Sequence, residues 1–454
     1  MPVSNLALHA KNIKAQKPLI KRNDPISKLK KVLWLYILLL VFEGALRKWV
    51  LPFLSGPLLI VRDPVALYIL FLAGQQKIVY KSAYIAWMVA VGFIGILTAM
   101  VMGHHDFAVA LYGARIYVLH FPVIFVMGKV FNKKDVIQVG RFFVYSAIPI
   151  AVLIALQFKS PQSAFVNRGV GGDEAGAGFA GAMGYMRPPG TFSFTNGNTL
   201  YFQLVTCFIF YFWLYQNEIK RIVLLLGTGA LLMAIPLSIS RALFFFVAVC
   251  AGFTLVAVAR KPKYASKIIG AAIGISVLAI IIAKTSLFGT ALDAFLARFN
   301  GANEAEGGVE SVFLDRYLGG LINSLGFAEG NSIFGKGIGY GTSLGAQRLG
   351  PSFTEGEWGR IIFEQGPIFG MIIIIVRVAF SFDIFFKSFK MLKKEEFLPW
   401  ILFSFLLLNV PQAQWKQPTA LGFSVVIGGL VLAAFRVPKL VKPRIAPKNV
   451  SPIS

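Results

Sequence analysis

Residues 28–50 read KLKKVLWLYILLLVFEGALRKWV, a single apolar run between two groups of basic residues. A transmembrane helix needs roughly 20 mostly apolar residues, and the run at 32–49 approaches that length. The run follows a long basic segment, and no small-residue cleavage site comes after it. We therefore expect a membrane anchor rather than a cleaved signal peptide.

Similar apolar runs recur as far as residue 435 and predict an all-α, polytopic membrane protein with about twelve transmembrane helices. The composition agrees, since 56% of residues are hydrophobic and 14% are charged. A mean hydropathy of +0.69 is well above that of soluble domains. The predicted spans lie at 32–49, 57–74, 83–102, 107–131, 136–158, 199–215, 221–239, 242–259, 266–284, 361–386, 397–411 and 419–435.

Lysine and arginine are concentrated in every second loop between these apolar runs, and we call these loops the basic joints. Because basic residues are retained on the cytoplasmic side, the pattern predicts a cytoplasmic N-terminal segment (1–31), a membrane domain (32–435) and a cytoplasmic tail (436–454). The basic joints hold Lys77 and Lys81; Lys133 and Lys134; Lys220 and Arg221; Arg260, Lys261, Lys263 and Lys267; Lys387, Lys390, Lys393 and Lys394; and Arg436, Lys439, Lys442 and Arg444.

Two of the expected extracytoplasmic loops, 159–198 and 285–359, are far longer than usual connections. The first is rich in glycine and tightens into a turn at residues 187–190. In the second, acidic residues outnumber basic ones such as Arg298, and residues 311–325 are apolar enough for a helix over the membrane face. Loops of this length usually carry function.

Several functions are excluded by what the chain lacks. The formal charge is +25, but the basic residues lie at helix ends rather than on one surface, so we expect no nucleic-acid partner. P-loop, Rossmann and serine-elbow motifs are absent.

The two cysteines, Cys207 and Cys250, lie inside apolar runs, and the histidines are scattered, so no disulfide, metal or cofactor is expected. Glu43 with Arg47 and Arg62 with Asp63 are interpreted as structural pairs.

Charged residues on the expected outer side resist the positive-inside trend and are therefore the candidates for function. Guanidinium groups bind phosphate in a bidentate manner, so converging arginines suit a diphosphate head group. Simpler alternatives stay open: a helix-end arginine that snorkels to the interface, a solvated loop charge, and a capping box at residues 354–357. The candidates are Arg187, Arg241, Arg316, Arg360, Glu355, Glu357 and Glu364.

The chain resembles the superfamily of O-antigen polymerases and O-antigen ligases at these residues. RPPGTF at 187–192 resembles the family's motif before a span, and SRA at 240–242 resembles its Ser-Arg-small motif. DR at 315–316 and GKGIG at 335–339 resemble the stretch that leads to a glycine-rich turn. EWGRIIFEQGPIFG at 357–370 resembles the start of a late helix that ends in Glu-x-Gly-x-x-Gly.

The resemblance implies a membrane glycosyltransferase of the bacterial inner membrane. Its partners would be an undecaprenyl-diphosphate-linked glycan as donor, an acceptor glycan, membrane lipid and other polysaccharide-assembly proteins, without a metal or nucleotide sugar. Arg187, Arg241, Arg316 and Arg360 would bind the diphosphate. Glu357, ahead of Glu355, would act as the general base.

Alternatives to this function stay open. Ligases of the superfamily carry a histidine where this chain has Glu355, which favours a polymerase or exopolysaccharide relative over a ligase that acts on lipid A core. A twelve-helix transporter is a second class, although its site would lie at the membrane midplane. A non-catalytic component of a polysaccharide-assembly complex is a third.

Overall fold

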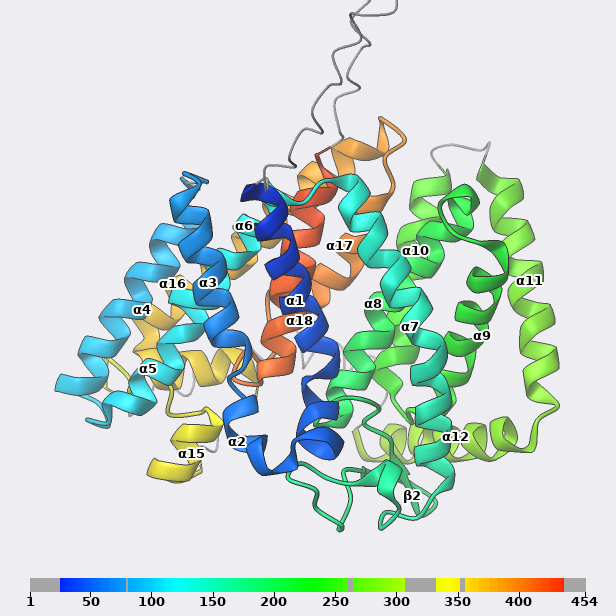
Figure 1. The fold of residues 1–454 in the computed structure, drawn as a ribbon, viewed down its shortest axis with the longest axis horizontal. Coiled ribbons are helices and arrows are strands. Elements are labelled where there is room, and N and C mark those ends of the chain that lie inside the picture. Colours follow the sequence, from blue (N-terminus) through cyan, green and yellow to red (C-terminus); the bar gives the residue numbers. More distant parts are fainter. Residues whose placement is uncertain (1–24, 79–80, 260–263, 307–331, 352–355, 437–454) are drawn as a thin grey trace, which may run out of the picture.

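The protein is described by a computed structural model that covers residues 25–78, 81–259, 264–306, 332–351 and 356–436. These residues form helices, with one two-stranded antiparallel sheet, β1 paired with β2. Figure 1 shows the longer helices running roughly side by side, with shorter elements gathered at one end of the bundle. The all-α class expected from the sequence is confirmed apart from this hairpin.

The N-terminal half contains seven α-helices, interrupted by short π- and 3₁₀-helices. Two π-helices, η1 and η3, continue α-helices without a turn, so residues 107–130 form one continuous helix. The elements are α1 (Pro25–Ala45), η1 (Leu46–Val50), η2 (Pro52–Leu54), α2 (Ser55–Leu58), α3 (Arg62–Gln75), α4 (Ala83–Val101), α5 (Phe107–Arg115), η3 (Ile116–His120), α6 (Phe121–Val130) and α7 (Lys133–Lys159).

The C-terminal half begins with the small hairpin and continues as helices. Its elements are η4 (Phe165–Asn167), β1 (Phe179–Ala182), β2 (Tyr185–Arg187), α8 (Thr195–Leu214), η5 (Gln216–Glu218), α9 (Arg221–Leu237), α10 (Arg241–Ala259), α11 (Ala265–Ala283), α12 (Ser286–Glu306), α15 (Ser343–Leu349), α16 (Glu357–Leu392), α17 (Leu398–Asn409) and α18 (Pro418–Ala434).

Each apolar run of the sequence coincides with a helix, and several helices are able to span a membrane. By length and hydropathy, five described helices are long and apolar enough, or up to seven if each of two bent pairs is one span. Helices α9, α17 and α18 are apolar but shorter. The presence of several membrane-spanning helices is thus supported, and the number twelve stays a prediction.

The basic joints that the sequence pattern groups together meet at one end of the bundle, which we call the basic end (residues 131–134, 215–220, 393–396 and 436). Lys30 forms an ion pair of 2.7 Å with Asp135. Lys133 pairs with Glu396, and its amide donates to the carbonyl of Arg436 at 3.1 Å. The first and last described residues both lie at this end (Figure 1).

The loops that the sequence expects on the opposite side meet at the other end, which we call the loop end (residues 160–194, 286–306 and 332–351). The amide of Gly171 donates to the carbonyl of Arg47 at 3.1 Å, and the Trp49 indole donates to the carbonyl of Phe165 at 2.9 Å. Helix α12 bends by 100° from α11 and lies across this end (Figure 1). The apolar piece at 311–325 lies outside the described residues.

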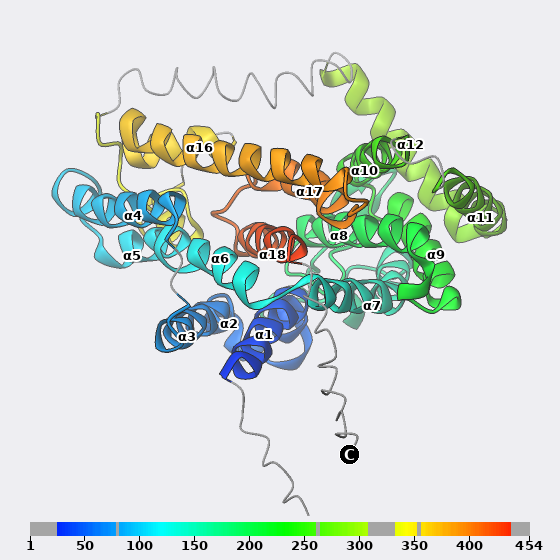
Figure 2. The same cartoon turned by 90° about the horizontal axis from the view of Figure 1, so that it is seen from above.

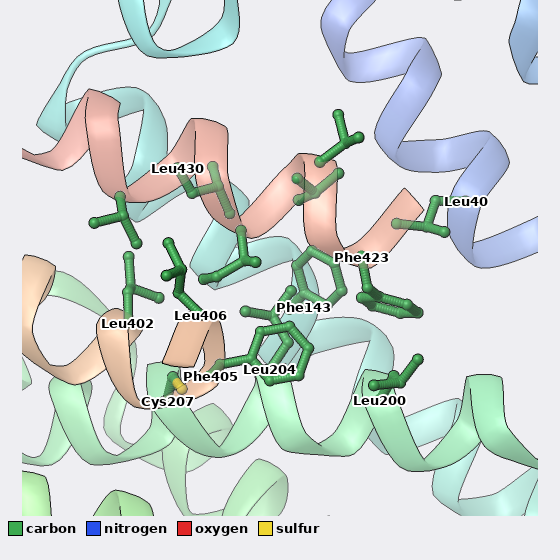
Figure 3. Packing of buried hydrophobic residues seen from close by; sticks show 14 of the residues in the cluster. Leu40, Phe143, Leu200, Leu204, Cys207, Leu402, Phe405, Leu406, Phe423 and Leu430 are labelled. Carbon is green, nitrogen blue, oxygen red and sulfur yellow. The ribbon is translucent and has the colours of Figure 1, made fainter. Parts of the chain in front are cut away.

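Helix α18 lies in the middle of the bundle and packs against α6, α8 and α17 (Figure 2). Side chains of α8, α17 and α18 interlock there, with the rings of Phe405 and Phe423 in an edge-on contact of 6.2 Å near Leu204 (Figure 3). Gly428 of α18 faces Ile124 of α6, where a β-carbon would come within 2.9 Å of the isoleucine side chain. Small residues at this position let the two backbones approach closely.

Helix α16 is two helices joined by a break at Gly366, which has φ of 73° and precedes Pro367. A β-carbon at residue 366 would collide with the carbonyl oxygen of Ile333, so residues 333–335 pack into the break. Glycine adopts positive φ without steric penalty, whereas other residues do not. The break therefore separates a short segment that starts at Glu357 from the long segment that contains Arg377.

Candidate functional site: an arginine cluster and a buried ion-pair network

Arg187 ends strand β2 at the loop end and is half-buried. Its Nε donates to the carbonyl of Ser238 at 3.4 Å, which links the hairpin to the turn between α9 and α10. Burial, and then the positive charges of Arg298 and Arg241, together lower the pKa of the guanidinium to about 10. The group stays protonated at neutral pH but lies among like charges.

Arg241 is the first residue of α10 and is placed there by a strained turn. The preceding Ile239 is buried and has φ of 46°, a conformation that β-branched residues rarely adopt. Ser240 follows, and its hydroxyl accepts from the amide of Leu243 at 3.4 Å and from the Thr199 hydroxyl at 3.2 Å. Strained backbone of this kind persists where packing enforces it and is enriched at functional sites.

Arg298 of α12 completes what we call the arginine cluster: Arg187, Arg241 and Arg298. Its Nη1 donates to the carbonyl of Gly181 in β1 at 3.1 Å, so α12 is docked onto the hairpin beside Arg187. The sequence shows this arginine only as one basic residue in an acidic loop. Its role depends on the fold of α12 across the loop end, for which the sequence holds no direct signal.

The other charged candidates form a separate buried network on α16. Arg360 donates to both carboxylate oxygens of Glu357, at 3.0 and 2.9 Å, and to Glu364 at 2.6 Å. Arg377 also donates to Glu357, at 2.8 Å. The four side chains are fully buried, and two carboxylates balance two guanidinium groups. Such charges are tolerated in an apolar interior only when paired.

Backbone groups complete this network. Glu364 accepts from the amides of Gly341 and Gly339, at 2.8 and 3.2 Å, and so anchors the glycine-rich turn that follows Gly335. Arg377 donates to the carbonyls of Val410 and Ala413, both at 2.8 Å. Its guanidinium carbon lies 3.8 Å from the centre of the Trp415 ring, within the range of a cation–π contact. The network therefore ties two other chain segments, the glycine-rich turn and residues 410–415, to α16 on both sides of its break.

Glu357 is not part of a capping box in the described helix. Helix α16 begins at Glu357 with Gly356 as its N-cap, and no side chain caps it. The carboxylate of Glu357 instead accepts from Arg360, Arg377 and the amide of Trp415. The capping-box alternative placed Glu357 one turn further into a helix, and the observed start of α16 replaces it.

The structure thus brings Arg187 and Arg241 together and joins Arg360 to Glu357 elsewhere. Arg316 and Glu355 lie outside the described residues. Lys416, in the joint before α18, lies near the ion-pair network; burial and then Arg360 lower the pKa of its ammonium group, while Glu357 and Glu364 oppose that shift. Sequence reasoning passed over Lys416 because one lysine in a short joint carries no pattern.

The intrahelical charges are paired, but only one pair is the one expected. Glu43 pairs with Arg47 at 3.5 Å, as expected, and also with Arg62 at 3.2 Å. The expected partner of Arg62, Asp63, instead pairs with Arg115 at 2.6 Å and lies 2.8 Å from Nε2 of His120. Among the described residues, no three His, Cys, Asp or Glu side chains lie close enough together to hold a metal ion.

The fold and these two clusters define an all-helical protein with membrane-spanning helices and a group of arginines at one end of its bundle. Comparison with protein-family models, curated proteins and solved structures gives no match for this chain.

Proposed function

We propose that the protein is a polymerase-like glycosyltransferase of a bacterial inner membrane, and that the arginine cluster binds the diphosphate of an undecaprenyl-diphosphate-linked glycan. The observation that carries the proposal is geometric: Arg187 donates to the carbonyl of Ser238, three residues before Arg241, and Arg298 donates to the carbonyl of Gly181 in the strand paired with that of Arg187. Two of these residues are the arginines of the RPPGTF and SRA motifs on which the family resemblance rests.

Electrostatics favours an anionic ligand at this cluster. Three half-buried arginines belong to this cluster, and the positive charges of Arg298 and Arg241 act on Arg187. A diphosphate accepts several charge-assisted hydrogen bonds from planar donors of this kind. The strained turn at Ile239 directly precedes Arg241, and strained backbone of this kind is enriched at functional sites.

The proposed reaction is a glycosyl transfer. The acceptor hydroxyl forms a bond to the anomeric carbon of the donor glycan, and the bond from that carbon to the diphosphate oxygen breaks. The leaving undecaprenyl diphosphate takes the electron pair of the broken bond, and the arginines stabilise its negative charge without a metal. A general base takes the acceptor proton.

Two carboxylates are proposed for the base, and their surroundings differ. Glu357 is fully buried, and both of its oxygens accept hydrogen bonds from arginines, so as placed it holds Arg360 and Arg377. Removal of a proton by Glu357 would require one of these contacts to open. Glu355 lies outside the described residues and stays the alternative base.

The proposed orientation follows from the basic end. Positively charged joints are retained in the cytoplasm, so the basic end would face the cytoplasm and the arginine cluster would face the opposite side. Polyprenyl-linked glycans displayed there would approach from the plane of the membrane. Arg316 remains a proposed contributor to the diphosphate site. Arg360 could contribute only if its contacts with Glu357 and Glu364 opened.

A deletion strain tests this function and separates its alternatives. Loss of long surface glycans with retention of single repeat units supports a polymerase. Loss of all glycan from lipid A core, with long lipid-linked chains accumulating, indicates a ligase instead. Loss of long surface glycans and of single repeat units from the surface, with lipid-linked single repeats retained inside the cell, indicates a transporter. Complementation by Arg187→Lys, Arg241→Lys and Arg298→Lys alike, at normal protein level, would remove the arginine cluster as the diphosphate site and favour a non-catalytic assembly component.

A further inference from the structure

Lys48 is a buried lysine that belongs to neither cluster of charged residues. It lies in η1, where the first helix reaches the loop end, and it is 1% exposed. Its Nζ donates to the carbonyl of Gly190 at 2.6 Å and lies 4.3 Å from the centre of the Trp49 ring. Among the described residues, no carboxylate forms an ion pair with it.

A lysine at this position is unfavourable for folding. A buried ammonium loses its hydration, and one carbonyl and one ring face replace only part of what it loses. A methionine of similar length would fill the same space without a charge. Ionisable residues inside membrane domains are costly and usually functional. The burial of Lys48 therefore indicates a role other than stability.

The contacts of Lys48 lead to the turn formed by the RPPGTF motif, because Gly190 is held from two helices. Gln157 of α7 accepts from the Gly190 amide at 2.8 Å and donates to the Gly190 carbonyl at 3.2 Å. Lys48 donates to the same carbonyl from η1, so two donors occupy both acceptor positions of one oxygen. The place of Gly190 between α7 and η1 is therefore fixed on both sides.

The end of the first helix also holds the residues that follow this turn. The Thr191 hydroxyl donates to the carbonyl of Val41 in α1 at 2.8 Å. Nη1 of Arg47 in η1 donates to the Ser193 hydroxyl at 3.0 Å. The motif thus lies directly against α1 and η1, and these elements form the surface on which it is placed.

The placement of Gly190 reaches Arg187 through two prolines. Each proline fixes its own φ at about −65° and restricts the residue before it, so Pro188 and Pro189 leave this stretch few conformations. Asn198 of α8 also donates to the carbonyl of Pro188 at 3.3 Å. A displacement at Gly190 is therefore passed to the backbone of Arg187 rather than absorbed between the two residues.

We propose that Lys48 is a positioning residue, whose buried ammonium fixes Gly190 and thereby sets the direction of Arg187. A charge-assisted hydrogen bond holds a carbonyl more strongly than a neutral one, which accounts for a lysine at this position. The effect on glycan transfer rests on the proposed function, whereas the effect on the turn does not. Lys48 acts through Arg187.

Hydrogen exchange of the purified full chain tests the effect on the turn. Loss of a charge-assisted hydrogen bond corresponds to about a ten- to hundredfold change in a local opening equilibrium. Lys48→Met should therefore speed amide exchange in residues 186–193 by about tenfold or more. Its thermal unfolding temperature should equal or exceed that of the parent, because Gln157 still donates to the carbonyl and a buried charge is gone.

Two further variants complete this experiment. Lys48→Gln keeps a neutral donor, should give an exchange rate between those of the parent and Lys48→Met, and replaces the methionine variant if that variant does not fold. Lys159→Met is the matched control, since Lys159 is exposed at the end of α7. Exchange in residues 186–193, unfolding temperature and transfer rate of this control should equal those of the parent.

A double-mutant cycle tests whether Lys48 acts through Arg187. Lys48→Met alone should lower the rate of glycan transfer by about tenfold, but it should change that rate by less than about twofold in an Arg187→Lys background. A residue that affected transfer only through stability would lower the rate by the same factor in both backgrounds.

Unchanged exchange of residues 186–193 in Lys48→Met would overturn the inference. An unfolding temperature well below that of the parent would also overturn it, because the lysine would then serve stability. Equal factors of rate loss in the two backgrounds would separate Lys48 from Arg187 and remove the positioning role. A parent protein that transfers no glycan refutes the proposed function instead, and the exchange result then decides whether Lys48 fixes the turn.

Discussion

Arg377 lies 20 positions after Glu357, beyond the break in α16, yet its Nη1 donates to Oε1 of Glu357 at 2.8 Å. The break at Gly366 turns the short first segment so that its carboxylate meets an arginine of the long second segment. Two arginines therefore share one carboxylate inside the protein. Glu357 therefore has a structural role in holding the two segments of α16 together, whether or not it also acts in catalysis.

Glu357→Gln should destabilise the protein. The network changes from balanced charge to one net positive charge, and the amide nitrogen of glutamine would face a guanidinium donor. Breaking a buried ion pair by removing one partner costs about 3–5 kcal/mol, so thermal unfolding of the purified variant should begin well below that of the parent.

Asp383→Asn is a suitable control for that substitution, because Asp383 pairs with Lys387 on the surface of the same helix and both side chains are largely exposed. An exposed pair contributes about 0–1 kcal/mol. If Glu357→Gln unfolds like the parent but transfers no glycan, Glu357 is a base rather than a structural residue.

Replacing arginine by lysine at the arginine cluster should abolish most glycan transfer. Arg187→Lys, Arg241→Lys and Arg298→Lys each keep the charge but lose the planar fork, and loss of one such stabilising donor costs about a hundredfold in rate. Chain-length distribution of the surface glycan and rates with a lipid-linked donor measure the effect.

Arg168→Lys provides the control, since Arg168 lies in the same loop as Arg187 and pairs with the exposed Glu174 at 3.2 Å. Glycan chain length and transfer rate in this variant should equal those of the parent. Normal chain lengths in all three cluster variants, at parental protein level, would reduce the cluster to helix-end and loop charges.

Gly366→Ala should destabilise α16 and the residues packed into its break. Alanine at positive φ costs about 1–3 kcal/mol in backbone strain, and its β-carbon would displace the carbonyl of Ile333. Unfolding of the purified protein, followed by heat or denaturant, measures the loss.

Gly252→Ala is the matched change in a regular helix, with open space around the added methyl group. It should be neutral or stabilise by up to about 1 kcal/mol. Equal stability of the two alanine variants would show that the break does not require glycine.

The orientation of the bundle can be tested with single cysteines, because the native Cys207 and Cys250 are both buried. A cysteine at the exposed Asn300 should react with an impermeant thiol reagent in cells whose outer barrier is open, and one at Lys393 should not. The opposite labelling pattern would invert the proposed topology.

The sequence by itself determined where the helices lie, because hydropathy and the positions of basic residues are local properties of the chain. The run at 32–49, for example, lies within α1 and η1, and the joints at Lys133 and Lys393–Lys394 lie at the same end of the bundle. The number of spans and the side that each end faces remain predictions.

Only the tertiary structure decided which charged residues meet. Arg298 reaches Gly181 in the hairpin that holds Arg187 because α12 bends across the loop end, and Arg377 reaches Glu357 because Gly366 breaks α16. Contacts of this kind join residues that are distant in sequence, and the hydropathy of a segment does not specify its partner. The same reason explains why residues 354–357 suggested a cap, while the fold uses Glu357 to pair two buried arginines.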